Sequence, residues 1–156
     1  MRFWRICRRA HHKPDGEGAR LVGGRWNRPG RPVIYGSLNL SLAALEVLVH
    51  MRVEQLPADY VAQIFTADGL QHENITTADL PPGWPDPSRG SILAEIGDRW
   101  LVERRSAIAI VPSVVIYEEN NVLLNPQHPD FNRITVSIAR SFQLDVRLLH
   151  AKAGAM

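Results

Sequence analysis

Two stretches of the chain place apolar residues at the spacing of an amphipathic helix, which returns to the same face every three to four residues. The first runs from Leu40 to Met51, and residues 37–39 before it offer polar side chains that can cap a helix. The second runs from Ser91 to about Glu103. The stripes consist of Leu42, Leu45, Leu48 and Val49 in the first stretch and Ile92, Ile96 and Trp100 in the second. Both stretches are predicted to be helices packed against a core.

Shorter runs rich in β-branched, aromatic and other apolar residues predict strands around these helices. The runs are Phe3–Cys7, Pro32–Gly36, Tyr60–Thr66, Ala107–Val111, Val114–Tyr117 and Val122–Leu124, with one more strand expected within Ser141–Leu149. Glycine and proline mark Lys13–Pro32 and Asp79–Pro87 as mostly loop. Strands and helices follow one another irregularly, without repeated βαβ units. This order predicts an α+β domain.

The composition fits one globular domain over residues 1–156, since 45% of the residues are hydrophobic and 22% are charged. The sequence contains neither a signal-peptide pattern nor a bilayer-spanning apolar run, so we expect a cytoplasmic protein with no membrane partner. The single cysteine, Cys7, excludes an internal disulfide, and the histidines lack the spacing of a metal site. We therefore expect no bound metal.

Basic residues are concentrated in two stretches, Arg2–Lys13 and Arg20–Arg31. The pI near 9.0 is compatible with a nucleic-acid binder. The formal net charge is nevertheless only +2, because 16 acidic residues nearly balance 18 basic ones. A local basic stretch suits a bound phosphate group at least as well as a duplex, whose binding requires several spread phosphate contacts. Composition leaves both kinds of ligand open.

Glu46 is the only carboxylate of the predicted helix Leu40–Met51, and at about 100° per residue it borders the apolar stripe. A carboxylate buried without a partner costs several kcal/mol, so such a residue is usually paired or functional. The alternative is a glutamate on the helix flank that reaches solvent or pairs with Arg52. On the helix pattern alone this alternative is favoured.

Three further residues are candidates for ligand contacts. Arg25 follows Gly24 in a glycine-rich segment, where the backbone can approach a ligand and the guanidinium can bind a phosphate through two hydrogen bonds. Tyr35 lies next to the glycine that ends a predicted strand, where its ring can stack on an aromatic base. Ser113 lies between two apolar runs and offers a hydroxyl. Taken singly, each has a plain structural explanation as a solvated arginine, a core tyrosine or a turn serine.

These residues occur in an order that resembles the RES-domain family, the toxin half of a bacterial toxin–antitoxin pair, named for an arginine, a glutamate and a serine. The matching segments are Phe3–Arg5, Gly24–Asn27, Val33–Ser37, Leu42–Glu46, Val111–Ser113, Leu124–Pro126, His128–Asp130 and Phe142–Leu148. They extend over nearly the whole chain. Each segment is unspecific by itself, and the ordered set carries the resemblance.

The resemblance implies a fold similar to that of ADP-ribosyltransferase toxins, in which two small, mostly antiparallel β-sheets form an NAD⁺ cleft flanked by helices. It implies Arg25, Glu46 and Ser113 as catalytic residues, and Arg25, Tyr35 and Ser113 as substrate-binding residues. Glu46 would stabilise the oxocarbenium-like state formed as the nicotinamide–ribose bond breaks. Arg25 would hold a phosphate, while Tyr35 would stack on nicotinamide and Ser113 would orient it.

The resemblance also implies NAD⁺ as a substrate, with no cofactor, and a DNA-binding antitoxin of the Xre type whose tail would block the cleft. Direct nucleic-acid binding by this chain is not expected. The oligomeric state, including a homodimer inside a larger complex, stays open. The family's serine is assigned to Ser113 because a proline precedes it, although Ser137 and Ser141 lie nearby in sequence.

The leading hypothesis is a toxin that depletes NAD⁺ by hydrolysis or phosphorolysis of the nicotinamide–ribose bond. One alternative is a mono-ADP-ribosyltransferase that uses the same cleft to modify a host protein. Another is an RNA-binding or nucleolytic toxin, which the basic stretches favour but for which no RRM, KH or helix-turn-helix signature occurs. The last is an interaction module without catalysis, whose cellular effect would survive replacement of Arg25 and Glu46.

Overall fold

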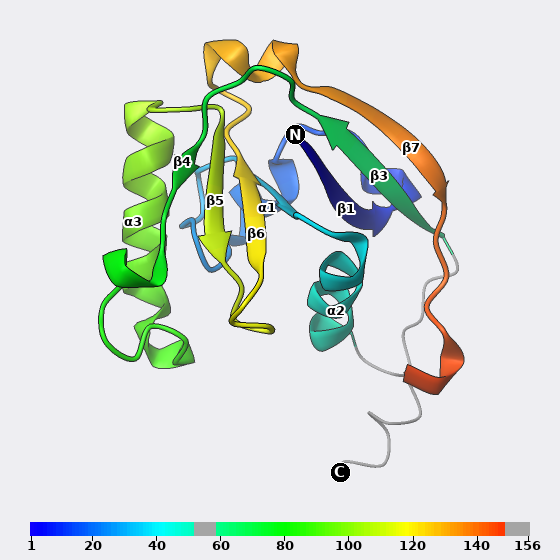
Figure 1. Ribbon diagram of the computed structural model, residues 1–156, viewed down its shortest axis with the longest axis horizontal. Coiled ribbons are helices and arrows are strands. Elements are labelled where there is room, and N and C mark those ends of the chain that lie inside the picture. The colour runs from blue at the N-terminus through cyan, green and yellow to red at the C-terminus, as the bar shows by residue number, and fades with distance from the viewer. Residues whose placement is uncertain (52–58, 149–156) are drawn as a thin grey trace.

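The structure, a computed structural model, describes residues 1–51 and 59–148. In these residues seven strands form one sheet of order β4-β5-β6-β2-β1-β3-β7, and only β4 and β5 pair in parallel (Figure 1). The strands are β1 (Arg2–Arg8), β2 (Ile34–Ser37), β3 (Tyr60–Thr66), β4 (Glu73–Asn74), β5 (Ile108–Pro112), β6 (Asn120–Leu124) and β7 (Thr135–Ser141). The α-helices are α1 (Glu17–Val22), α2 (Leu40–His50) and α3 (Gly90–Glu103). None in this described part is long and apolar enough to span a bilayer. The predicted α+β class is confirmed.

The two expected sheets are two halves of this single sheet. One half consists of β4, β5, β6 and β2, and the other of β1, β3 and β7. They meet where β1 pairs with β2, in a register that joins Trp4 to Ser37. Gly36 permits this junction, because a Cβ atom there would lie 2.8 Å from the carbonyl oxygen of Trp4. The mostly antiparallel pairing agrees with the prediction, whereas the two sheets are joined through β2.

The helices α2 and α3 cover the same face of the sheet. Side chains two residues apart on a strand share a face, and so do directly paired residues. Tyr35 and Ser37 of β2 therefore point to the same side as Trp4 of β1. Trp4 packs in a cluster with Ala43 of α2, while Tyr35 packs against the cluster that contains Leu93 of α3. The end of β2 thus lies between these helices, with α3 beside β4 and β5 in Figure 1.

α2 begins as predicted at Leu40. Asn39 caps the helix, because its Oδ1 accepts a hydrogen bond from the backbone N–H of Leu42 at 2.7 Å. The Nδ2 of the same side chain donates to Oε2 of Glu119, in the β5–β6 connection, at 2.5 Å. The N-terminus of the helix that carries Glu46 is therefore tied to the end of the sheet.

One predicted loop and one predicted strand fold differently from expectation. The predicted loop Lys13–Pro32 contains α1, a six-residue helix that buries none of its residues and so has no apolar stripe. The predicted strand Val114–Tyr117 is a turn. The hydroxyl of Ser113 accepts hydrogen bonds from the backbone N–H groups of Val115 and Ile116, and these bonds bend the chain.

The last strand and the buried face of α3 also differ from their predicted positions. β7 ends at Ser141, where the expected strand Ser141–Leu149 was to begin, and residue 149 lies outside the described residues. All seven residues of β7 are exposed at the edge of the sheet. Buried and exposed side chains therefore do not alternate along this strand. In α3, Ile92 is 39% exposed, whereas the neighbouring Leu93 is fully buried.

Candidate functional site

A tight turn over Gly24–Asn27 carries Arg25. Asn27 is 1% exposed, and its amide fixes the path of the backbone on both sides of the turn. The Nδ2 atom donates to three carbonyl oxygens, those of Ala19, Arg28 and Arg31, at 2.8, 3.2 and 2.9 Å. The position of Arg25 is thereby set by a buried hydrogen-bond network.

Tyr35 of β2 holds the other side of this turn. Its hydroxyl donates to Oδ1 of Asn27 at 2.7 Å and accepts from the backbone N–H of Trp26 at 3.0 Å. Burial raises the pKa of the Tyr35 hydroxyl, which the Trp26 bond and the charge of Arg25 only partly offset, so the group stays protonated and can donate. Because the hydroxyl is committed to the turn, the part of Tyr35 that can meet a ligand is its ring.

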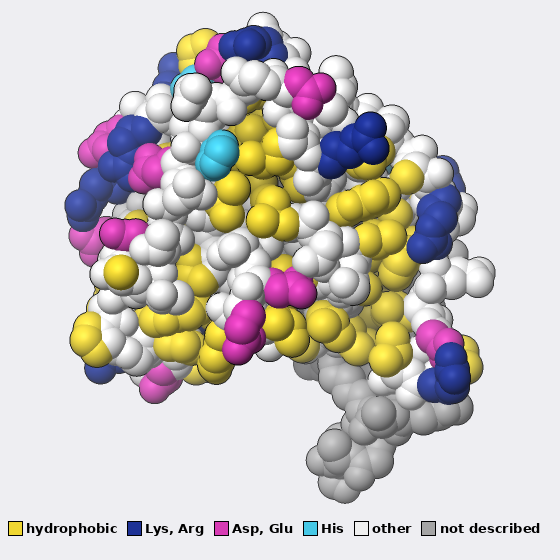
Figure 2. All heavy atoms as spheres, in the orientation of Figure 1, with side chains coloured by type: hydrophobic (Ala, Val, Ile, Leu, Met, Phe, Trp, Pro, Cys, Tyr) yellow, Lys and Arg dark blue, Asp and Glu magenta, His cyan; other side chains and the backbone are white. Residues whose placement is uncertain are grey.

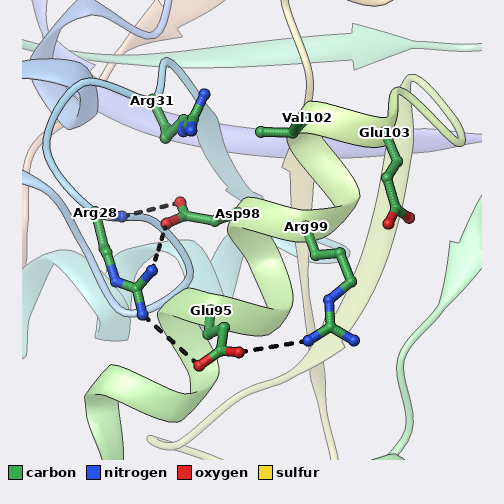
Figure 3. Close-up of a pocket in the computed structure, with 7 residues that line it drawn as sticks. All are labelled: Arg28, Arg31, Glu95, Asp98, Arg99, Val102 and Glu103. Atoms are coloured by element: carbon green, nitrogen blue, oxygen red, sulfur yellow. Dashed lines mark hydrogen bonds and ion pairs between the residues drawn. The ribbon is translucent and has the colours of Figure 1, made fainter.

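The turn is also fixed on α3. A Cβ atom at Gly97 would lie only 1.9 Å from the carbonyl oxygen of Trp26, so glycine is required for this close approach. The backbone N–H of Arg28 donates to Asp98 at 3.1 Å, and its guanidinium lies between Asp98 and Glu95 (Figure 3). The surface depression drawn in Figure 3 is lined by these three residues together with Arg31, Arg99, Val102 and Glu103. We therefore assign that depression to the support of the turn.

Arg25 is half-buried, and in residues 1–51 and 59–148 it makes no hydrogen bond or salt bridge. Two other arginines of the segment are occupied, since Arg20 pairs with Glu17, and Arg28 pairs with α3. Arg25 lies next to Tyr35 along the turn, because the Tyr35 hydroxyl binds the backbone N–H of the following residue, Trp26. A positioned, unpaired guanidinium is suited to bind a phosphate.

Glu46 of α2 faces the sheet. Its Oε1 accepts a hydrogen bond from Oγ of Ser113 at 2.8 Å and another from Nδ2 of Asn121 at 2.5 Å. Arg52, the alternative partner, lies outside the described residues. Both donors at Oε1 are neutral, so they orient the carboxylate without neutralising its charge.

Ser113 lies beneath Glu46 and is fully buried. Its hydroxyl accepts the two backbone N–H groups of the following turn and donates to Glu46. A side chain enclosed in this way orients Glu46 and presents no surface to nicotinamide, the contact that the resemblance implies. Ser137 and Ser141, by contrast, lie on the exposed edge strand β7. Proximity to Glu46 therefore favours Ser113 as the serine of the site, in a supporting position.

The β2 strand connects the two parts of the site. Tyr35 and Ser37 share a face and are about 7 Å apart along the strand. Ser37 donates to Oδ1 of Asn121 at 2.7 Å, and Asn121 in turn donates to Glu46. The Arg25 turn and Glu46 are thus held on one face by adjacent positions of β2. Asn121 is a site residue that sequence reasoning missed, because its place beside Glu46 follows from the pairing of β2 with β6, which no local pattern specifies.

The charges are unevenly distributed around this site. In Figure 2, Lys and Arg side chains lie around the rim of the molecule together with many acidic ones, whereas only acidic side chains lie between the β5–β6 connection and α2. In the described ranges, no three His, Cys, Asp or Glu side chains gather in a way that could hold a metal ion. The chemistry that these residues offer is that of an oriented carboxylate, an aromatic ring and a guanidinium.

Tyr35→Phe tests the proposed support of the Arg25 turn. The change leaves a backbone N–H and an amide oxygen without their partner, at about 1–3 kcal/mol for each group that stays buried. We expect Tm to fall by several degrees, since about 1 kcal/mol corresponds to about 2–4 °C in a chain of this size. Tyr117→Phe is the control, because Tyr117 is 60% exposed. Equal Tm values for the two variants in thermal unfolding would contradict this assignment.

Comparison with known proteins places these features in a family. The RES domain family matches residues 2–146. A protein of Sphingobium sp. (strain YBL2), named "Prs ADP-ribosylating toxin", is 36% identical over 154 residues, covering 94% of this chain and 96% of its own length. "Toxin Res" of Photorhabdus laumondii is 38% identical over 139 residues, covering 88% and 89%.

A solved structure shows the same fold. It is described as the M. tuberculosis MbcT-MbcA toxin-antitoxin complex, and it matches with a TM-score of 0.74 at 19% identity. The match covers 96% of this chain and 87% of that one. The resemblance noted in the sequence is confirmed by the family match, by relatives above 30% identity over most of their length, and by the fold. The chain belongs to the RES domain family.

Proposed function

We propose that this chain is the toxin component of a toxin–antitoxin system, and that it depletes NAD⁺ by breaking the bond between nicotinamide and ribose. One observation carries the proposal. The carboxylate of Glu46 is held through Oε1 alone by Ser113 and Asn121, while Oε2 accepts no hydrogen bond from residues 1–51 and 59–148. An oriented carboxylate with one available oxygen suits a reaction in which positive charge develops on a sugar.

The chemistry follows from the leaving group. Nicotinamide departs as a neutral molecule with the electron pair of the C–N bond, and the ribose C1 becomes oxocarbenium-like. Water then adds and loses a proton, giving ADP-ribose, or phosphate adds and gives a phosphorylated ADP-ribose. Oε2 of Glu46 stabilises the developing charge or holds a ribose hydroxyl. NAD⁺ is the substrate in this scheme, and no metal or cofactor takes part.

Arg25 and Tyr35 bind the dinucleotide in this proposal. The guanidinium of Arg25 holds a phosphate, which is supported by its lack of a partner in the described residues. The ring of Tyr35 stacks on nicotinamide, since its hydroxyl is occupied by the turn. These contacts place C1 of the ribose near Glu46 and contribute orientation more than chemistry.

A second candidate is transfer of ADP-ribose to a protein. The name of the Sphingobium relative, "Prs ADP-ribosylating toxin", favours it, because that relative is 36% identical over nearly the whole chain. The same carboxylate would act in both reactions, and only the acceptor differs. Hydrolysis or phosphorolysis remains our first proposal, with the acceptor decided by experiment.

An RNA-binding role receives less support from the structure. Several arginines of the two basic stretches are paired within the chain, including Arg8 with Asp59 and Arg20 with Glu17. Arg28 is paired with two carboxylates of α3. Paired arginines contribute little to the release of counterions from a nucleic acid.

The proposed partner is a DNA-binding antitoxin of the Xre type, acting on the toxin in the cytoplasm. The match to a toxin-antitoxin complex supports a protein partner. Arg25 is a docking point for such a partner, because a C-terminal carboxylate can occupy the position of a phosphate.

The acceptor can be identified with NAD⁺ labelled in its adenine ring. Purified protein is incubated with the label in phosphate buffer and in a phosphate-free buffer, each with and without cell extract, and the products are separated by mass. We expect free ADP-ribose or its phosphate adduct. Label bound to a protein of the extract would instead support ADP-ribosyl transfer, and intact NAD⁺ under all conditions would contradict both reactions.

A further inference from the structure

Two neutral side chains, Ser37 and Asn121, form a relay between the sheet and Glu46. They are directly paired in the register of β2 and β6, and their side chains point to the same face. Ser37 is 2% exposed, and its Oγ donates to Oδ1 of Asn121 at 2.7 Å. With Oδ1 engaged in this way, the amide nitrogen of Asn121 faces Glu46, to which it donates at 2.5 Å.

We propose that Asn121, held by Ser37, is a positioning residue that fixes the carboxylate of Glu46 for cleavage of NAD⁺. The inference rests on the proposed function. Glutamate has several rotatable bonds, and a half-buried one on a helix samples several orientations unless its head group is held. Ser113 and Asn121 reach the same oxygen from the ends of two neighbouring strands, β5 and β6. One bond locates Oε1, and the second fixes the direction in which Oε2 points.

The relay also explains why residue 121 is polar. On β6, Asn121 alternates with the fully buried Val122 and shares its face with Leu123, which lies in the core beneath α3. An apolar residue would extend that core. The amide instead supplies a donor to a carboxylate and an acceptor to a buried hydroxyl. The hydrogen bonds therefore run from Ser37 through Asn121 to Glu46, the group proposed to perform the chemistry.

The test separates a positioning role from a general structural one. Nicotinamide release is measured for Asn121→Ala, Asn121→Asp and Ser37→Ala, with Asn120→Ala as the matched control. Asn120 is the neighbouring asparagine on β6, and its side chain points to the opposite face. For Asn121→Ala and Asn121→Asp we expect kcat to fall about 10- to 100-fold, with KM changed less than about threefold. Ser37→Ala should give a smaller fall, and Asn120→Ala none.

A second comparison uses the Glu46→Gln background. Asn121→Asp keeps the shape of the side chain and its bond from Ser37, but it places a negative charge against the Glu46 carboxylate. A glutamine at position 46 can instead donate to that aspartate. We therefore expect Asn121→Asp to leave the residual rate of Glu46→Gln unchanged within about twofold, because residues that act through one another are not additive. A residue with a structural role alone would lower the rate in both backgrounds.

The outcomes are distinct. Wild-type kcat in Asn121→Ala, together with a strongly reduced rate in Glu46→Gln, would overturn the positioning role and leave the proposed function standing. A raised KM with unchanged kcat would also overturn it, since Asn121 would then contact NAD⁺ itself. If the wild type released no nicotinamide, both the positioning role of Asn121 and the proposed function would be wrong. If Asn121→Ala does not fold, Asn121→Asp and Ser37→Ala decide the question.

Discussion

Glu46→Gln is expected to lower kcat for nicotinamide release about 100-fold or more, with KM for NAD⁺ nearly unchanged. Glutamine has the same shape and keeps an oxygen that can accept the bonds from Ser113 and Asn121. It loses the negative charge that stabilises the oxocarbenium-like state. Because the hydrogen bonds are retained, Tm should stay within a few degrees of the wild-type value. Steady-state kinetics and thermal unfolding measure the two quantities.

Glu118→Gln provides the matched control for this variant. Glu118 is an exposed carboxylate in the β5–β6 connection, close in sequence to the residues that hold Glu46. Its replacement changes the net charge equally and should leave kcat at the wild-type value. A similar loss in both variants would mean that the local negative potential matters more than the oriented Glu46 carboxylate, and the proposed role would be wrong.

Arg25→Ala is expected to raise KM for NAD⁺ about 10- to 150-fold, which corresponds to the loss of one charge-assisted contact worth about 1.5–3 kcal/mol. The guanidinium makes no hydrogen bond or salt bridge in the described residues, so its removal should leave Tm nearly unchanged. The side chain acts at the phosphate, away from the bond that breaks. We therefore expect kcat to fall much less than in Glu46→Gln.

Arg31→Ala is the control for Arg25→Ala. Arg31 follows the same turn, is exposed, and contributes a backbone oxygen, not its side chain, to the Asn27 network. If positive charge attracted NAD⁺ only at long range, removing either arginine would raise KM by the same factor. That result would contradict a direct contact between Arg25 and a phosphate. Increasing salt distinguishes the two further, because it screens the long-range effect.

The fold was predictable where local patterns are strong. The helix at Leu40 and the strand Tyr60–Thr66 have the predicted start and bounds, because a capping side chain and a β-branched run are local signals. The predicted stripe of α2 is only partly buried, since Leu42 lies in the core whereas Val49 is 49% exposed. The short helix α1 and the edge strand β7 bury no side chain, so neither leaves such a pattern. The apolar run Val114–Tyr117 was misleading because the Ser113 hydroxyl captures its backbone N–H groups.

In the candidate site, too, residues in local motifs were predictable, whereas contacts that depend on strand pairing and packing were not. Arg25, Tyr35 and Glu46 belong to local motifs, and the family resemblance located them from the sequence. The pairing of Ser37 with Asn121 joins residues far apart in the chain and depends on the register of β2 and β6, which no local pattern specifies. The burial of Ser113 beneath Glu46 likewise follows from the packing of α2 on the sheet.

The central claim is that this chain breaks the nicotinamide–ribose bond with Glu46. The most direct measurement follows nicotinamide and NAD⁺ together after purified wild-type protein and Glu46→Gln are each mixed with NAD⁺. We predict that the wild type releases one nicotinamide for each NAD⁺ consumed, and that Glu46→Gln releases it at about one hundredth of that rate or less. Intact NAD⁺ with the wild type, or equal rates for the two proteins, would contradict the claim.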